Sequence, residues 1–242
     1  MEKFSKNFVS NEKGNSREFS ADSITEKRPL GQGRFGEVSE VEVTKDSVTM
    51  NFAIKDYKRN GTYSNKEARK NAEAAYSNYL NAKQAGLKVF STVRLSKDKP
   101  QLLLTLGSNN ETILISKDSA VSWERVSGIA NMGSLVEAMG QNVIKSVQAG
   151  IKLRRDSYFF LAQKDRPTNI DFLVGDYERL EKSERTPREL FKKNMVSVRD
   201  VLVNTLVEKY LKLDSDEAYE FLSTFITKQV QDFVDNHELE FK

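Results

Sequence analysis

The stretch GQGRFGEV, from Gly31 to Val38, constrains the fold of this chain more than any other stretch. Its glycines stand at Gly31, Gly33 and Gly36, a spacing that holds phosphate groups in several unrelated folds. The segment that follows decides between these folds. In EVSEVEV, valines alternate with polar residues, which is typical of a half-buried strand. We therefore expect the glycines to connect two strands.

This strand context excludes two common phosphate sites. A dinucleotide-binding fingerprint leads from a strand into a helix, whereas Gly36 leads into a strand. A Walker-type loop needs Gly-Lys-Ser/Thr after its last glycine, and this chain has Gly-Glu-Val. The remaining option is a β-hairpin folded over the phosphates of a nucleotide. Glycines in such a hairpin let the backbone N–H groups approach the phosphate oxygens closely.

A hairpin of this kind needs a lysine on the next strand, and FAIK at residues 52–55 supplies one. Lys55 could reach the α- and β-phosphates. Val38 would pack on the base, and Ala53 is small where an adenine would lie. The predicted nucleotide site therefore consists of Gly31, Gly33, Phe35, Gly36, Val38, Ala53 and Lys55.

Composition removes several classes of chemistry. The chain of 242 residues has no cysteine and one histidine, His237, so thiolate catalysis, disulfides and sites built from several histidines are excluded. A net charge of +3 makes no case for a nucleic-acid partner. No apolar run approaches the roughly 20 residues of a membrane span, and no signal peptide is visible. We expect a cytoplasmic protein without a membrane partner, whose chemistry rests on carboxylates, Lys, Arg, hydroxyls and backbone.

The first half of the chain is predicted to be a flexible arm over residues 1–22 and a compact domain over residues 23–107. The arm is rich in Ser, Asn, Lys and Glu. A helix begins at Ser64, whose spacing to Glu67 fits a capping box, and ends before Gly86. Strands are expected in ITEKRPLGQ, EVSEVEVT, SVTMNFAIKDY, LKVFSTVRLS and QLLLTLG, with a hairpin turn at TKDS between the second and the third.

The second half, residues 108–242, is predicted to be mainly helical. SLVEAMGQNVIKSVQAGI carries apolar residues at helical spacing, and two strand-like runs, DSYFFLA and IDFLVGDY, follow it. Two amphipathic helices close the chain, RELFKKNMVSVRDVLVNTLVEKYLKL, with a break near Asn194, and SDEAYEFLSTFITKQVQDFVDN. Strands first and helices second indicate an α+β fold of two lobes, hinged near Leu106–Gly107.

GQGRFGEV combined with FAIK resembles the small lobe of the protein kinase-like superfamily, and the resemblance extends over residues 24 to about 180. It implies a two-lobed fold, with a five-stranded antiparallel small lobe that carries one helix and a reduced, mainly helical large lobe. It also implies ATP and Mg²⁺ as cofactors, and a glutamate on the helix that holds Lys55 by an ion pair. We assign that glutamate to Glu73, which borders the apolar face of the helix, because the capping box already accounts for Glu67.

The same resemblance assigns two aspartates in the second half. Asp176 follows the apolar run FLVG in GDY and resembles the metal-binding aspartate of the family, whereas the rival Asp171 stands at the start of the strand. Arg155 and Asp156 match the Arg-Asp pair of the catalytic loop, which makes Asp156 the expected base.

Three features depart from the pattern of the family. Arg154 replaces the histidine of the catalytic loop, and Leu161 stands where an asparagine would supply the second metal ligand. Asn169 is a poor substitute for that ligand, because a strand separates it from Asp156. No Ala-Pro-Glu follows Asp176. Departures of this kind occur in the aminoglycoside-kinase-like branch and other atypical branches.

Three functions are compatible with these observations. The resemblance implies an ATP-dependent phosphotransferase that moves the γ-phosphoryl group to a hydroxyl of a protein or small molecule. The missing asparagine and activation segment favour the alternative, a pseudokinase that binds a nucleotide or serves as a scaffold. The third is a β-rich interaction domain with an accidental glycine pattern. The retained glycines and Lys55 favour nucleotide binding in either of the first two cases.

Overall fold

The computed structural model describes residues 21–33, 35–58, 63–95, 99–105, 112–115, 125–163 and 165–241. The chain divides into two compact units. Unit 1 comprises Met1–Tyr79 and Phe90–Asn110, and unit 2 comprises Leu80–Val89 and Glu111–Lys242. Nearly all of the expected N-terminal arm, residues 1–20, and the expected hinge at Leu106–Gly107 lie outside the described residues.

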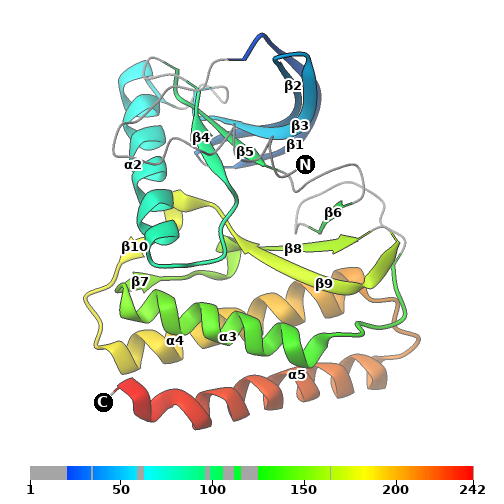
Figure 1. Cartoon of the computed structure of the whole chain (residues 1–242). Helices are drawn as coiled ribbons and strands as arrows, with labels where there is room; N and C mark the ends of the chain where they lie inside the picture. Colours follow the sequence, from blue (N-terminus) through cyan, green and yellow to red (C-terminus); the bar gives the residue numbers. More distant parts are fainter. Residues whose placement is uncertain are drawn as a thin grey trace. The chain divides into compact units, whose positions relative to one another are not determined.

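Unit 1 is built on an antiparallel sheet, drawn in blue to green in Figure 1. Over its described residues the sheet has five strands in the order β1-β2-β3-β5-β4. This confirms the five-stranded antiparallel sheet expected for the first half of the chain. The strands are β1 (Ser23–Gly33), β2 (Gly36–Lys45), β3 (Val48–Asp56), β4 (Thr92–Arg94) and β5 (Gln101–Thr105).

The turn between β2 and β3 confirms the hairpin predicted at TKDS. Asp46 and Ser47 have φ angles of 50° and 64°, so both central residues are left-handed, as in the hairpin turns that match the twist of the flanking strands. The backbone N–H of Asp46 donates to the carboxylate of Asp22 at 2.8 Å. Local chemistry thus fixes the register of these two strands.

Helix α2 (Asn65–Gln84) follows β3 and also confirms its predicted ends. At its start the backbone N–H of Ser64 donates to the carboxylate of Glu67 at 3.0 Å, and the Glu67 N–H donates back to the hydroxyl at 3.3 Å. Gly86, with a φ of 74°, ends it. Its buried face is made of small residues and one tyrosine: Ala68, Ala72, Ala75, Tyr79 and Ala82.

One face of the unit 1 sheet carries the hydrophobic core of this unit. Directly opposite residues of neighbouring strands share a face, so Val41 and its partner Phe52 point to the same side. The core cluster on this side consists of Val41, Val43, Phe52, Ile54, Leu95 and Leu103. The alternate residues of these strands, among them Ala53 and Lys55 on β3, point to the other face.

Unit 2 combines short strands with long helices (Figure 1). Within its described residues one sheet has the order β6-β8-β9, and β7 pairs with β10. Strand β6 was not predicted from the sequence, and neither were β7 and β10. The elements are β6 (Thr112–Ile115), α3 (Met132–Gln148), β7 (Ile151–Lys152), the 3₁₀ turn η1 (Arg155–Ser157), β8 (Tyr158–Gln163), β9 (Arg166–Val174), the 3₁₀ turn η2 (Tyr177–Arg179), β10 (Glu181–Lys182), α4 (Pro187–Val201), the π-helical segment η3 (Leu202–Tyr210), α5 (Asp216–His237) and the 3₁₀ turn η4 (Glu238–Phe241).

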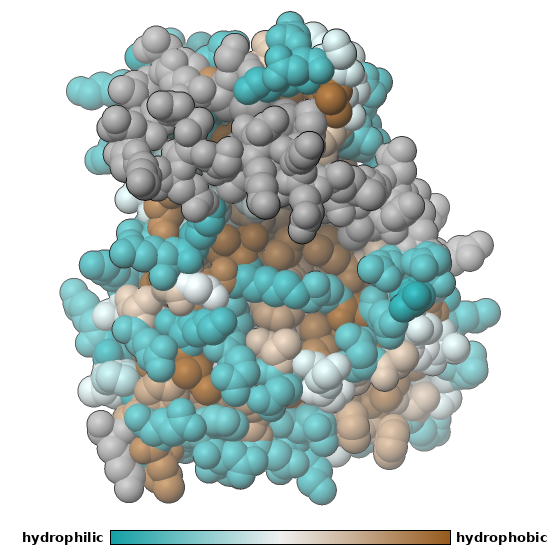
Figure 2. All heavy atoms as spheres, viewed as in Figure 1, coloured by the Kyte–Doolittle hydropathy of each residue, from teal (hydrophilic) through white to brown (hydrophobic). Residues whose placement is uncertain are grey.

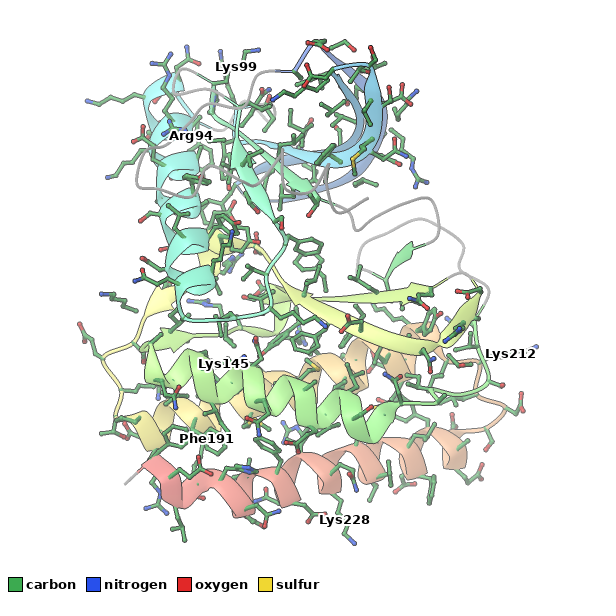
Figure 3. All side chains as sticks on the ribbon, viewed as in Figure 1. Arg94, Lys99, Lys145, Phe191, Lys212 and Lys228 are labelled. Carbon is green, nitrogen blue, oxygen red and sulfur yellow. The ribbon has the colours of Figure 1, made fainter. Side chains whose placement is uncertain are left out.

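Helices α3, α4 and α5 pack against one another and form the core of unit 2. The ring of Phe191 on α4, labelled in Figure 3, lies 4.8 Å from the ring of Phe241 and 6.5 Å from that of Phe233 on α5, between ring centroids. A Cβ on Gly140 would come within 2.4 Å of the Phe233 ring, so α3 and α5 approach closely there. On the face seen in Figure 2, hydrophilic residues lie over α3 and α5, with apolar residues between them.

Helix α4 corrects one expectation, because it does not break near Asn194. Asn194 is buried and its side chain bonds to backbone outside the helix, so the helix keeps its own hydrogen bonds through this position. The irregular part starts later, at Leu202, where the chain continues as a π-helix to Tyr210. Among the helices that the structure describes, none has the length and apolar character needed to cross a membrane.

Candidate functional site

The predicted nucleotide-binding residues of unit 1 lie together on the face of the sheet opposite its core. The strand register places Gly31 opposite Val38 and Val38 opposite Lys55. The same row continues through Leu102 to Arg94 at the far edge of the sheet. Neighbours in such a row are about 4.8 Å apart along the hydrogen-bonding direction. Gly31 and Val38 of GQGRFGEV and Lys55 of FAIK thus stand in one row across three strands.

Ala53 belongs to the same face, because it precedes Lys55 by two positions on β3. Its cross-strand partners are Glu40 on β2 and Leu104 on β5. Ala53 is buried, whereas Lys55 is partly accessible. The face therefore offers a small apolar position next to an ammonium group, the combination expected beneath a nucleotide base and its phosphates.

The three glycines of the loop differ in how much room a side chain would have at each position. Gly36 has a φ of 153°, and a Cβ there would stand 2.2 Å from the carbonyl oxygen of Asp56 at the end of β3. Glycine is therefore required at this position by the fold itself. A Cβ on Gly31 would meet no described atom within 4 Å, and one on Gly33 would meet only the Gly36 oxygen at 4.0 Å. No described atom of unit 1 requires a glycine at these two positions.

Phe35 lies in the turn between β1 and β2, which Gly33 and Gly36 close as the last paired residues. Its ring stacks on that of Tyr63, with centroids 6.5 Å apart and planes 7° from parallel. Tyr63 directly precedes Ser64, the cap of α2. The tip of the glycine hairpin is thus linked to the segment that starts the helix.

The structure gives Lys55 and Glu73 neighbours that the sequence analysis did not consider. The Lys55 ammonium lies 5.6 Å from the centroid of the Tyr57 ring, a cation–π distance. The Glu73 carboxylate lies 3.1 Å from the guanidinium of Arg94, whose side chain is only 12% exposed against 58% for Glu73. Figure 3 shows Arg94 beside α2. The ion pair between Lys55 and Glu73 remains a prediction.

In unit 2 the β8–β9 hairpin brings the two candidate aspartates together. Asp156 stands two residues before Tyr158, the first residue of β8, and Asp176 stands two residues after Val174, the last residue of β9. Tyr158 and Val174 are directly paired. The N–H of Gly175 extends this pairing by donating to the Ser157 carbonyl at 2.8 Å. The antiparallel ladder therefore ends with both aspartates at the same end of the hairpin.

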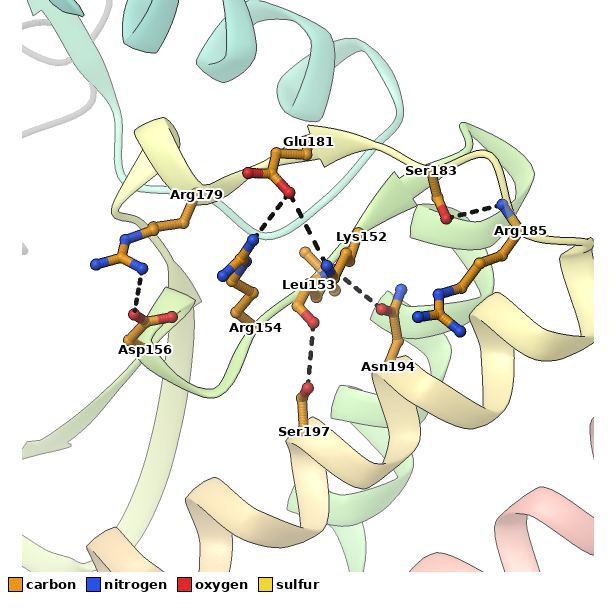
Figure 4. A network of polar contacts seen from close by, with 10 residues as sticks. All are labelled: Lys152, Leu153, Arg154, Asp156, Arg179, Glu181, Ser183, Arg185, Asn194 and Ser197. Carbon is orange, nitrogen blue, oxygen red and sulfur yellow. Dashed lines mark hydrogen bonds and ion pairs between the residues drawn. The ribbon is translucent and has the colours of Figure 1, made fainter.

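Arg179 lies between these two carboxylates. Its Nη1 is 3.7 Å from Oδ2 of Asp156, as Figure 4 shows, and its Nε is 3.8 Å from Oδ2 of Asp176. The side chains of Asp156 and Asp176 are 48% and 21% exposed. The sequence analysis did not single out Arg179. The sequence spacing could have indicated it, because an arginine three residues after an aspartate in a short turn can reach back to that aspartate.

Helix α4 holds the segment that leads into Asp156. The Leu153 N–H donates to Oδ1 of Asn194 at 3.0 Å, and Nδ2 of Asn194 donates to the Ile151 carbonyl at 3.0 Å. The Ser197 hydroxyl donates to the Leu153 carbonyl at 3.1 Å. Figure 4 shows Asn194 and Ser197 reaching this strand from one side of α4. The sequence signal was an amide and a hydroxyl three residues apart on an otherwise apolar helix face.

In the same segment, Arg154 bonds to β10 through its side chain. Its guanidinium donates to the Glu181 carboxylate at 2.9 Å, and the Lys152 ammonium is 3.9 Å from that carboxylate. The hydrogen bond from Arg154 is the main reason that the pKa of Glu181 is lowered. Arg154, which stands where the family has a histidine, therefore takes part in a structural ion pair.

The other candidates are placed away from Asp156. The ammonium of Lys88 forms an ion pair with Asp171, whose carboxylate also accepts from the Phe172 N–H at 2.8 Å. Asn169 is exposed on β9, five residues from the end of the strand near Asp176, or about 17 Å along it. Asn169 cannot therefore supply the second metal ligand in this conformation.

Asp156 and Asp176 suit Mg²⁺ only as part of a site that substrate phosphates complete. No group of three or more Asp, Glu, His or Cys side chains able to hold a metal occurs among the described residues. Mg²⁺ is usually bound through one or two carboxylates together with substrate phosphates. Asp156 and Asp176 provide such a pair, and a metal there would have to share it with Arg179.

Comparison with known proteins adds likeness in structure only. Neither a scan against protein-family models nor a search of curated proteins finds a match. Similar solved structures include the kinase domain of PknI from Mycobacterium tuberculosis and two of its double mutants. Their sequence identities to this chain are 11%, 12% and 12%, with TM-scores of 0.46, 0.48 and 0.47. The matches cover 93% of this chain and 99–100% of each kinase domain. Such distant likeness supports no conclusion about activity, ligands or partners.

Proposed function

We propose that this chain binds ATP and acts as a kinase-like phosphotransferase on a hydroxyl of a protein or small molecule. The observation that carries the proposal is the row Gly31–Val38–Lys55, which places a glycine, an apolar contact and an ammonium side by side on one face of the unit 1 sheet. Lys55 would hold the α- and β-phosphates. Val38 and Ala53 would contact the base, and the backbone of the glycine hairpin would cover the phosphates.

Unit 2 would supply the acidic residues. Asp176 would hold Mg²⁺, which supplies charge neutralisation on the phosphates when bound. Asp156 would orient the acceptor hydroxyl and accept its proton. Asn194 and Ser197 support this role indirectly, because their hydrogen bonds to the strand before Asp156 fix the direction in which the chain enters the turn.

ATP binding can be tested by the shift of the melting temperature on titration with ATP, with and without Mg²⁺. The wild type should be stabilised, and Lys55→Ala should lose most of the shift, because the phosphates lose their counter-charge. Lys27→Ala is the matched control, since Lys27 lies on β1 of the same sheet and pairs with Glu42 at 3.2 Å. If ATP does not stabilise the wild type, the proposed nucleotide site is wrong.

A pseudokinase is the second candidate, and three ion pairs of the structure favour it. Glu73 forms an ion pair with Arg94. Arg179 forms ion pairs with both Asp156 and Asp176. Incubation with γ-labelled ATP separates the two functions. Label on an acceptor or on the chain itself that is lost in Asp156→Asn indicates phosphoryl transfer. ATP binding without any transfer indicates the pseudokinase.

A further inference from the structure

Two carboxylates at one end of a hairpin repel each other unless a cation lies with them. Asp156 and Asp176 are in this position, and the cation that the structure places with both is the side chain of Arg179. It uses different nitrogens for the two contacts, Nη1 for Asp156 and Nε for Asp176. A planar guanidinium suits this arrangement, since its donors point in several fixed directions.

The backbone around Asp176 holds Arg179 in place. Asp176 has left-handed angles, φ 51° and ψ 53°, and starts the 3₁₀ turn η2. The Arg179 N–H donates to the Asp176 carbonyl at 2.9 Å, and the buried ring of Tyr177 anchors the turn from within. The cation is therefore tethered three residues from one of the carboxylates that it contacts.

The two ion-pair contacts measure 3.7 and 3.8 Å, and the Arg179 side chain is 32% exposed. A divalent ion carries twice the charge of the guanidinium and would neutralise both carboxylates. A divalent ion and the guanidinium cannot approach the same oxygens together, because their positive charges repel.

We propose that Arg179 is an internal cation that competes with the divalent metal for Asp156 and Asp176. Its contact with the two carboxylates sets the metal affinity of this site. The inference rests on the proposed function for the metal role of Asp176. It also assigns to Arg179 a role in determining whether the divalent metal is bound.

The test is a titration with Mn²⁺ alone, without nucleotide, in which free Mn²⁺ is measured by electron paramagnetic resonance. Arg179→Gln should bind Mn²⁺ about tenfold more tightly than the wild type, since a nearby like charge shifts an ionic equilibrium by about one logarithmic unit or more. Arg179→Lys keeps the charge and should stay close to the wild type. Arg166→Gln is the matched control, because Arg166 pairs with Asp165 at the other end of the hairpin.

A second measurement uses the unaltered protein, so it does not depend on how a variant folds. Phenylglyoxal modifies accessible guanidinium groups, and peptide mass spectrometry locates them. Mn²⁺ should speed the modification of Arg179, which it displaces, and should leave that of Arg166 unchanged.

Equal or weaker Mn²⁺ binding by Arg179→Gln, or modification of Arg179 that Mn²⁺ does not change, would overturn the inference. Absence of Mn²⁺ binding in both the wild type and Arg179→Gln would also overturn the inference. The ATP titration with Lys55→Ala stays informative in that case, because it can be run without Mg²⁺ and then reports on Lys55, a residue of unit 1. The two failures can therefore be told apart.

Discussion

Replacing Gly36 with alanine should destabilise unit 1 strongly, whereas the same change at Gly31 should not. At Gly36 the new Cβ would stand 2.2 Å from the Asp56 oxygen and 2.9 Å from the Cα of Tyr57. These atoms belong to backbone at the end of β3, so no side chain can rotate away. Ordinary contacts between such atoms begin near 3.4 Å, so the two strands would have to separate by about 1 Å.

The magnitude follows from two costs. Forcing extra volume into a packed site costs about 1–3 kcal/mol. A backbone with a φ of 153° is essentially restricted to glycine and adds about 1–3 kcal/mol for another residue. We expect Gly36→Ala to lower the free energy of unfolding by about 2–6 kcal/mol. Gly31→Ala, which meets no described atom within 4 Å, should change it by less than about 1 kcal/mol.

Urea unfolding followed by circular dichroism measures both changes, and hydrogen exchange of the β1–β3 amides assigns them to unit 1. The ATP titration is then applied to Gly31→Ala, which should fold like the wild type and bind ATP more weakly. Equal stability of Gly36→Ala and the wild type would refute the close approach of β2 to β3. Undiminished ATP binding by Gly31→Ala would refute the role of that glycine at the phosphates.

Three further predictions concern unit 2. Asn194→Leu should cost about 3 kcal/mol in urea unfolding, because it leaves the buried Leu153 N–H without its partner, and an unchanged unfolding midpoint would contradict the role of this amide. Tyr158→Phe should raise the stability by about 1 kcal/mol, since the buried hydroxyl has no hydrogen-bond partner in the part of the chain that the structure describes; a loss of stability would reveal a partner. The lowered pKa of Glu181, held down mainly by the hydrogen bond from Arg154, predicts a pH effect. Its stabilisation is fully present above the unfolded value of about 4.5 and is lost as the pH falls through the lower folded-state pKa. The difference in the free energy of unfolding between the wild type and Glu181→Gln should therefore be constant from pH 7 to pH 5 and shrink in more acidic buffer. A difference that does not change with pH would refute the contribution of the Glu181 carboxylate.

The sequence by itself determined the features that depend on neighbouring residues. The valine alternation after Gly36 predicted a strand, and β2 is one. The spacing of Ser64 and Glu67 predicted the start of α2, because a capping box involves only residues within one turn. The turn at Asp46 was predictable for the same reason. The missed strand β6 is a run of four residues, too short for its periodicity to distinguish it.

Only the tertiary structure decided which distant residues meet. The register of β2 and β3 places Lys55 opposite Val38. The packing of α2 in unit 1 brings Glu73 to Arg94. The periodicity of a single element shows which side of it is buried but does not show its neighbour. For this reason a helix break was predicted near Asn194, whereas Asn194 lies within α4 and holds a distant segment of the chain.

The same distinction applies to the candidate acidic site. Asp156 and Asp176 could be chosen from their motifs, but their meeting depends on the pairing of β8 with β9. Arg179 is visible in the sequence as one charge among many. Its place between the two carboxylates results from a left-handed turn at the end of the hairpin, which turns a side chain back onto residues that the ladder has already brought together.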